Sequence, residues 1–233
     1  MLVSTGLSEL DKKIGGGIPS GLTVLLEGEP GTGKTTISRQ FIYEGLQKGW
    51  KNVFLVTVEP IRKIIEEMKA IGLDPTPNKE DIVFVDVYGW RYRSKKEEEV
   101  DGIHILTTSG PLSDISVVLR NCFIEMGIES GGLLVFDSLS DLFIHEEQVM
   151  VLRFLETLVA RLHERNITSY FTVESGMHDH RVLASLSYIL NGTIKLKIEE
   201  EKRSLQIARM EGVPHNLGWL SFQINEGIAS LVT

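Results

Sequence analysis

The sequence predicts an α/β fold, in which helices cover both faces of a mostly parallel sheet. Five short runs rich in β-branched and large apolar residues recur along the chain, at 22–27, 53–58, 82–87, 132–136 and 168–173. Their hydrophobicity is nearly continuous, which is typical of strands buried on both faces. Helical patterns separate these runs, and this alternation indicates parallel strands joined by crossover helices.

Two amphipathic helices have the clearest pattern. The first begins after Pro60 and ends before Gly72, as a proline and a glycine favour. One side of it is apolar: Ile61, Ile64, Ile65, Met68 and Ile71. The second covers roughly 147–165 and also has an apolar side, made of Leu152, Leu155, Val159 and Leu162.

The chain changes character after about residue 186. The segments 192–198, 204–210 and 220–224 alternate apolar and polar residues, and Asn191-Gly192 is a turn signal. We therefore expect antiparallel strands added to the edge of the sheet. The 233 residues contain no internal repeat, low-complexity tract or linker, so we expect a single domain spanning 1–233.

Composition limits the environment and the partners. The single Cys122 excludes an internal disulfide and a cysteine metal cluster, and its apolar neighbours predict a core thiol on a helix. The first ten residues lack a basic start, and no apolar run is long enough to cross a bilayer. We expect a cytoplasmic protein without a membrane span. The net charge of -8 counts against permanent contact with nucleic acid.

A phosphate-binding motif follows the first strand directly. The segment GEPGTGKTT consists of Gly28, Glu29, Pro30, Gly31, Thr32, Gly33, Lys34, Thr35 and Thr36. Its glycines let the backbone fold around phosphates, while the following helix places its positive end beneath them. Lys34 brings a cation to the β- and γ-phosphates, and the Thr35 hydroxyl is suited to Mg²⁺. A glycine-rich turn with an incidental lysine is the alternative. The complete motif between a strand and a helix favours an ATP site.

A second magnesium ligand is expected at the end of another buried strand. Asp137 follows the apolar run Leu133–Phe136, which is the position of the Walker B carboxylate in nucleotide hydrolases with a phosphate loop. Ser138 is a candidate for orienting the water shell of the metal. The alternative is an aspartate that only stabilises the following turn.

Together, these segments resemble the RecA-like ATPases, and most closely their KaiC-like branch. The most specific part is the segment before the first strand, with Asp11 in a short helix and then the run Gly15–Gly21, GGGIPSG. The segments VTVEP, LLVFDSLSDL and LHERNITSYFTVES extend the resemblance, which reaches the final INEGIASLV. It implies a RecA-type three-layer sandwich that binds ATP and Mg²⁺. It also implies homo-oligomers, as rings or filaments with ATP at the subunit boundary.

The resemblance assigns two further catalytic residues. Glu59 corresponds to the glutamate that orients the attacking water, although an acid beside Pro60 would also favour the following helix through its dipole. Relatives often have two adjacent carboxylates here, whereas this chain has Val58 and Pro60 around Glu59. Arg209 corresponds to a cation that reaches the neighbouring subunit's γ-phosphate, but Glu211 replaces a second cation. We therefore expect slow hydrolysis.

The resemblance also places a γ-phosphate sensor at Glu174 and Ser175. The nearby residues His178, Asp179 and His180 are too close together for a well-formed metal site, so we interpret them as part of a polar loop. The tract 88–102 mixes aromatic and basic residues, but acidic residues follow at once. A solvated loop or a subunit contact explains the tract better than a nucleic-acid site.

Three functions remain open from the sequence. The leading hypothesis is a slow Mg²⁺-dependent ATPase whose turnover changes its assembly or its contacts with an unknown protein partner. The second is a regulatory module that binds ATP and ADP with negligible hydrolysis. The third is an accessory recombination protein that binds single-stranded DNA, which the acidic composition does not favour.

Overall fold

The computed structural model describes residues 1–87, 97–108, 110, 112–213 and 218–232 of the chain. Its helices are α1 (Ser8–Lys13), α2 (Lys34–Gln47), α3 (Ile61–Ala70), the 3-10 helix η1 (Thr76–Asp81), α4 (Leu112–Glu125), α5 (Leu139–His145), α6 (Gln148–Glu164) and α7 (His180–Ile189). The strands of the first half are β1 (Leu2–Val3), β2 (Ile18–Pro19), β3 (Thr23–Gly28), β4 (Asn52–Val56), β5 (Ile82–Asp86), β6 (Glu97–Val100) and β7 (Ile103–Thr107). Those of the second half are β8 (Leu133–Asp137), β9 (Thr168–Glu174), β10 (Gly192–Glu199), β11 (Lys202–Met210), β12 (Leu220–Asn225) and β13 (Ile228–Leu231).

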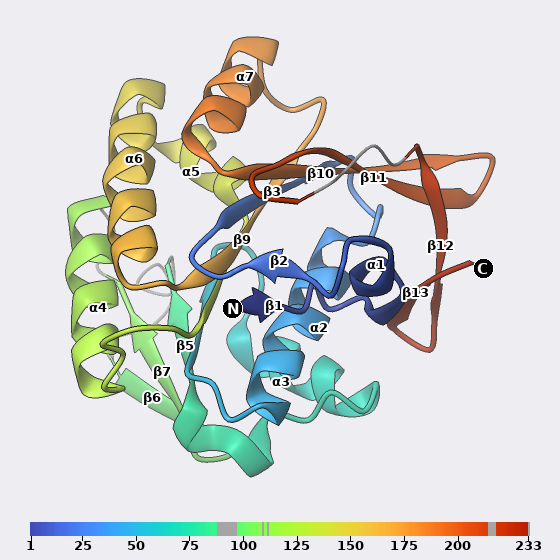
Figure 1. Ribbon diagram of the computed structural model, residues 1–233. Helices are drawn as coiled ribbons and strands as arrows, with labels where there is room; N and C mark the ends of the chain where they lie inside the picture. The colour runs from blue at the N-terminus through green and yellow to red at the C-terminus, as the bar shows by residue number, and fades with distance from the viewer. Residues whose placement is uncertain (88–96, 109, 111, 214–217, 233) are drawn as a thin grey trace.

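Among the described residues, one large sheet of 11 strands forms the centre of the fold (Figure 1). Its order is β13-β12-β11-β10-β3-β9-β8-β4-β5-β7-β6. The strands from β10 to β7 run parallel, and β6 and the strands from β11 to β13 pair antiparallel with their neighbours. The predicted α/β fold with added C-terminal antiparallel strands is therefore confirmed.

Helices pack on both faces of this sheet, so the fold has three layers (Figure 1). Helices α1, α2 and α3 contribute Leu10, Phe41 and Ile65 to one buried core. Helices α4 to α7 bury residues such as Leu119 and Leu155 in the other. Side chains of a strand alternate between the faces, and the neighbours Val24 and Leu25 accordingly belong to different cores.

Several elements differ from the sequence-based expectation. Strand β10 runs parallel to β3 and antiparallel to β11, so the antiparallel part begins one strand later than expected. The hairpin of β6 and β7 was not expected, because its first strand is rich in glutamate. It covers residues 97–100 of the tract that was interpreted as a loop, while residues 88–96 lie outside the described part.

Strand β4 ends at Val56 rather than at residue 58. Thr57 still binds the end of β8: its amide donates to the carbonyl oxygen of Asp137 at 3.0 Å, and its Oγ1 accepts a hydrogen bond from the Ser138 amide at 2.9 Å. The next residue, Val58, is 71% exposed. The chain therefore turns out of the sheet directly before Glu59.

The glycine-rich segment before β3 has a structural role. Asp11 accepts hydrogen bonds from the Ser4 hydroxyl and from the amide and hydroxyl of Thr5. Gly17 has a φ of +129°, and a Cβ there would lie 2.2 Å from the carbonyl oxygen of Val3. Only glycine allows β1 and β2 to approach this closely, so the segment fastens the N-terminal residues beside the central sheet.

The expectation for Cys122 is confirmed, since it lies buried on α4. Burial raises the pKa of its thiol to about 12. Among the helices described, none combines the length and the apolar character that crossing a bilayer requires.

Candidate nucleotide-binding site

The site lies where four parallel strands end side by side. Gly28 at the end of β3 is in register with Glu174 at the end of β9, and Val56 of β4 is in register with Asp137 of β8. The order β3-β9-β8-β4 therefore brings residues from distant parts of the sequence to one edge of the sheet. Ligands of open α/β sheets bind at this edge, beyond the carboxyl ends of the strands.

The phosphate loop connects β3 to α2. Gly33 is the N-cap of α2 with a left-handed φ of 107°. The Thr32 hydroxyl donates to the carbonyl oxygen of Glu29 at 2.7 Å, which closes the turn. A Cβ on Gly33 would lie 2.9 Å from the Cδ1 of Ile224 on β12. The loop is therefore held against the C-terminal strands, and the amide groups of the first turn of α2 are presented to an anion.

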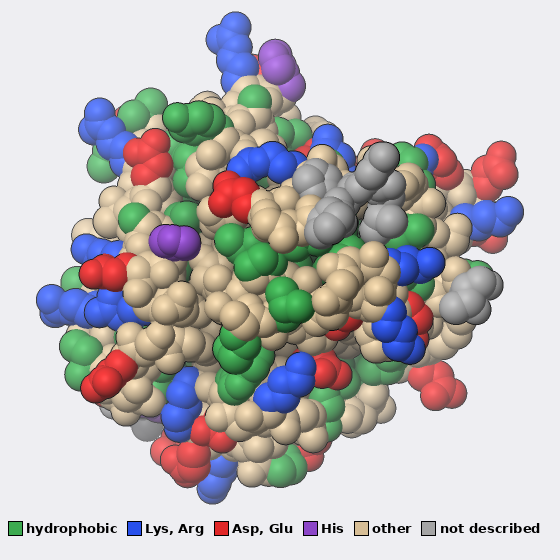
Figure 2. Space-filling view, in the orientation of Figure 1, with side chains coloured by type: hydrophobic (Ala, Val, Ile, Leu, Met, Phe, Trp, Pro, Cys, Tyr) green, Lys and Arg blue, Asp and Glu red, His purple; other side chains and the backbone are tan. Residues whose placement is uncertain are grey.

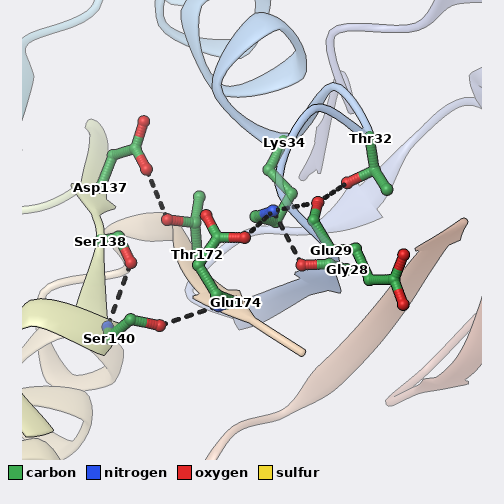
Figure 3. A network of polar contacts seen from close by, with 9 residues as sticks. All are labelled: Gly28, Glu29, Thr32, Lys34, Asp137, Ser138, Ser140, Thr172 and Glu174. Carbon is green, nitrogen blue, oxygen red and sulfur yellow. Dashed lines mark hydrogen bonds and ion pairs between the residues drawn. The ribbon is translucent and has the colours of Figure 1, made fainter. Parts of the chain in front are cut away.

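Lys34 points back into the loop (Figure 3). Its Nζ donates to the carbonyl oxygens of Gly28 at 2.8 Å and Glu29 at 2.9 Å. A third hydrogen bond joins Nζ to Oε2 of Glu174 at 2.7 Å. The Lys34 side chain is 4% exposed, so a charged ammonium is held at the centre of the predicted phosphate site.

Asp137 has a partner that fixes its carboxylate. The Thr172 hydroxyl on β9 donates to Oδ1 of Asp137 at 2.5 Å (Figure 3). None of the described residues binds the other oxygen, Oδ2, through a hydrogen bond or an ion pair. Thr35, the second residue of α2, is partly exposed. A carboxylate and a hydroxyl are the hard oxygen donors that Mg²⁺ prefers, so these residues fit a magnesium–nucleotide complex.

The model of one protein family, described as the KaiC ATPase, matches residues 3–232. The chain belongs to the KaiC ATPase family.

Individual relatives agree with this assignment. A UPF0273 protein of Pyrococcus horikoshii is 29% identical over 231 residues, which cover 96% of this chain and 91% of that protein. The circadian clock oscillator protein KaiC of Picosynechococcus is 25% identical over 236 residues, 97% of this chain but 43% of that protein. The crystal structure of a KaiC-like protein from Pyrococcus horikoshii superimposes with a TM-score of 0.78 at 24% identity, covering 100% of this chain and 99% of that one.

Glu59 of this KaiC-family chain lies in a cluster of ion pairs. Its Oε1 is 2.9 Å from the Nζ of Lys63, and its Oε2 is 3.3 Å from Nη2 of Arg39. Glu67 shares both cations, at 3.5 Å from Lys63 and 2.9 Å from Arg39. Strand β4, which leads to Glu59, lies next to β8 as expected, but it ends at Val56, so Glu59 lies in the segment after the strand. The predicted role of Glu59 in orienting water stays a prediction.

Arg209 also binds within its own chain. Its Nη1 donates to the carbonyl oxygens of Ser187 and Leu190, where α7 ends, and Nη2 lies 2.9 Å from Oε1 of Glu211. The free carbonyls of a helix end favour such a cation. The geometry thus supplies a local role for Arg209, and its action on a neighbouring subunit stays a prediction.

The residues after β9 take different positions. The Ser175 amide donates to the carbonyl oxygen of Gly28 at 3.0 Å, beside the phosphate loop. Asp179 is the N-cap of α7 and accepts from the Arg181 amide, and His180 is 2.8 Å from the same Asp179 carboxylate. Burial lowers the pKa of His178, while the Glu174 carboxylate acts in the opposite direction. In the described part of the chain, no group of three or more histidine, cysteine or acidic residues could hold a metal.

Sequence reasoning missed four supporting residues: Arg39, Thr57, Ser140 and Thr172. The Ser140 hydroxyl accepts from the Glu174 amide at 2.8 Å, and the Ser140 amide donates to Ser138. Both threonines are buried and bind the end of β8: Thr57 directly follows β4, and Thr172 lies within β9. The available signal was a polar residue near the end of an apolar strand. The residue that it binds depends on the order of the strands in the sheet, which the sequence does not show locally.

Proposed function

We propose that this chain is a single-domain ATP-binding protein that hydrolyses ATP slowly with Mg²⁺ and changes its assembly with nucleotide state. The observation that carries the proposal is the complete phosphate loop, with buried Lys34 at the end of β9, the strand between β3 and the Asp137 strand β8. Membership of the KaiC ATPase family supports ATP as the nucleotide.

The residues of the site divide the work of binding and hydrolysis. The loop from Gly28 to Thr36 and the amides of α2 would hold the phosphates, and Lys34 would contact the β- and γ-phosphates. Thr35 and Asp137 would hold Mg²⁺, whose charge offsets that of the β- and γ-phosphates. Glu59 would accept a hydrogen bond from water and direct it to the γ-phosphorus.

The environment of Glu59 supports slow turnover. Two cations, Arg39 and Lys63, bind its carboxylate and offset its negative charge, so it accepts a hydrogen bond from water less strongly than a free carboxylate would. Glu59 also has no adjacent carboxylate, because Val58 precedes it and Pro60 follows it. A base that is already neutralised is a weaker acceptor for the proton of water.

The test is phosphate release from Mg-ATP, measured at several protein concentrations. Lys34→Ala should abolish ATP binding, and Glu59→Gln should retain it while lowering turnover by roughly 100-fold. The matched controls are Lys48→Ala, at the C-terminal end of α2, and Glu66→Gln, an exposed acid on α3. Equal turnover in the wild type and both site variants would refute the proposal.

Assembly is tested in the same assay. If subunits complete each other's sites through Arg209, turnover per chain rises with protein concentration and Arg209→Ala removes that rise. A rate that does not depend on concentration would confine Arg209 to its observed role at the end of α7. Adding single-stranded DNA tests the third hypothesis. The net charge is -8, and the face shown in Figure 2 carries acidic as well as basic side chains. Because an acidic protein attracts phosphates weakly, we expect no stimulation.

The second candidate is an ATP-binding module without significant hydrolysis. The ion pairs of Glu59 favour it, as does the pairing of Arg209 with Glu211 inside one chain. ATP that stays bound and intact for many hours, with no phosphate release above that of Lys34→Ala, would select this function.

A further inference from the structure

The ammonium group of Lys34 has no free donor. It carries three N–H groups, and its three acceptors are the carbonyl oxygens of Gly28 and Glu29 and Oε2 of Glu174. A phosphate oxygen can therefore bind Lys34 only by replacing one of these partners. Two of them are backbone groups of the phosphate loop itself, so the replaceable partner is the Glu174 side chain.

The surroundings of Glu174 restrict the movement to its side chain. Its amide donates to the Ser140 hydroxyl at 2.8 Å, and its Cα is in register with Gly28 in the sheet. The next residue, Ser175, donates to the carbonyl oxygen of Gly28. The backbone is thus fixed on both sides, while the carboxylate is 24% exposed and can rotate away from Lys34.

We propose that Glu174 acts as an internal competitor of the nucleotide, with its carboxylate occupying the place of a phosphate oxygen on Lys34. This inference rests on the proposed function, because it assumes that nucleotide phosphates bind at Lys34. Nucleotide binding breaks an ion pair whose cation is 4% exposed. It also leaves the displaced carboxylate close to phosphates of the same charge sign, which opposes binding further.

Glu174 therefore regulates affinity by opposing binding. Triphosphate carries more negative charge than diphosphate, so the carboxylate lowers the affinity for ATP more than that for ADP. Glu174, at the end of β9, thus binds the Lys34 ammonium until a phosphate group replaces its carboxylate. Removing the charge should strengthen binding.

The test compares the wild type with Glu174→Gln by calorimetric titration with Mg-ATP, Mg-ADP and inorganic pyrophosphate. The amide is nearly the same size, so it keeps the shape and loses the charge-assisted hydrogen bond. We expect the dissociation constant for Mg-ATP to fall by roughly 10-fold or more, with a smaller fall for Mg-ADP. Pyrophosphate, which has no base, should also bind more tightly to the variant.

The matched control is Glu156→Gln, which makes the same change of net charge at an exposed position of α6. It should bind like the wild type, and thermal unfolding of each variant checks that it is folded. Equal or weaker binding of Mg-ATP by Glu174→Gln, with normal binding by the wild type, would overturn the competitor role alone. Failure of both folded proteins to bind any of the three ligands would overturn the proposed function and this inference together.

Discussion

The Thr172 hydroxyl lies 2.5 Å from Oδ1 of Asp137, and the two residues come from the adjacent parallel strands β9 and β8. This hydrogen bond fixes the orientation of the carboxylate that we assign to Mg²⁺. Thr172→Val keeps the shape of the side chain and removes the donor. Residues that hydrogen-bond to a metal ligand typically contribute about 10–100-fold to metal affinity. We therefore expect the Mg²⁺ concentration needed for ATP binding to be roughly 10-fold higher in the variant.

Titration of Mg²⁺ at a fixed ATP concentration measures this effect. Thr157→Val is the control, because this threonine is exposed on α6 and its hydroxyl bonds only to the Arg153 carbonyl of the same helix. An unchanged Mg²⁺ requirement in Thr172→Val would show that the hydrogen bond does not serve the metal.

Lys63 binds Glu59 at 2.9 Å and is 54% exposed. The pKa of Lys63 is raised because its hydrogen bond to Glu59, together with the negative charges of Glu59 and Glu67, favours the ammonium form. Lys63→Met removes one of the two cations on Glu59, so we expect phosphate release to become faster. The gain should be modest, roughly 2-fold, because exposed ion pairs are weak.

The control for this change is Lys48→Met, which breaks an exposed pair with Glu44 on α2. Steady-state phosphate release from both variants and the wild type gives the comparison. A slower rate in Lys63→Met would mean that Lys63 supports the Glu59 carboxylate in its catalytic position.

Asp11 binds the N-terminal segment through three hydrogen bonds from Ser4 and Thr5. Asp11→Ala removes these bonds and leaves the Thr5 amide without this acceptor. Hydrogen bonds to charged groups are worth more than neutral ones, so we expect the free energy of unfolding to fall by about 2–4 kcal/mol. Urea unfolding measures the change. Glu9→Ala on the same helix is the control, since Glu9 accepts a side-chain hydrogen bond only from Ser8.

Cys122 should react with thiol reagents only after unfolding. Burial raises its pKa from 9.0 to about 12, so the native thiol remains protonated at pH 8. An unfolded chain ionises near the ordinary pKa, which stabilises the unfolded state. The contribution of the thiol to stability is therefore complete below pH 9 and is lost as the pH rises towards 12.

Labelling with an aromatic disulfide at pH 8, with and without denaturant, checks the reactivity. Rapid labelling of the native protein would contradict a buried, protonated thiol. For the pH effect, Cys122→Ala should lose less stability than the wild type between pH 9 and pH 11.

Part of the site could be read from the sequence because its function depends on local backbone geometry. The motif from Gly28 to Thr36 needs glycines at fixed spacing after a strand, and Gly33 takes the left-handed φ that this requires. Asp137 could be placed because an apolar run precedes it directly, and it is the last residue of β8. Strands and helices also have local sequence patterns, so their alternation along the chain was enough to predict helices on both faces of the sheet.

Other contacts depend on pairing across the sheet. Lys34 and Glu174 are 140 positions apart, and they meet because β9 lies beside β3 in a register that aligns Gly28 with Glu174. Arg39 reaches Glu59 only because α2 and α3 lie on the same face of the sheet. Neither relationship has a local sequence pattern.

The sequence by itself determined which residues are suited in type and spacing to the proposed binding of phosphate and magnesium, since that suitability depends on residue types at short, regular spacing. Only the tertiary structure decided which charges neutralise each other in the folded chain: Glu174 with Lys34, and Glu59 with Arg39 and Lys63. The physical reason is that an ion pair depends on the distance between two groups in space. In this protein, strand order and helix packing set that distance.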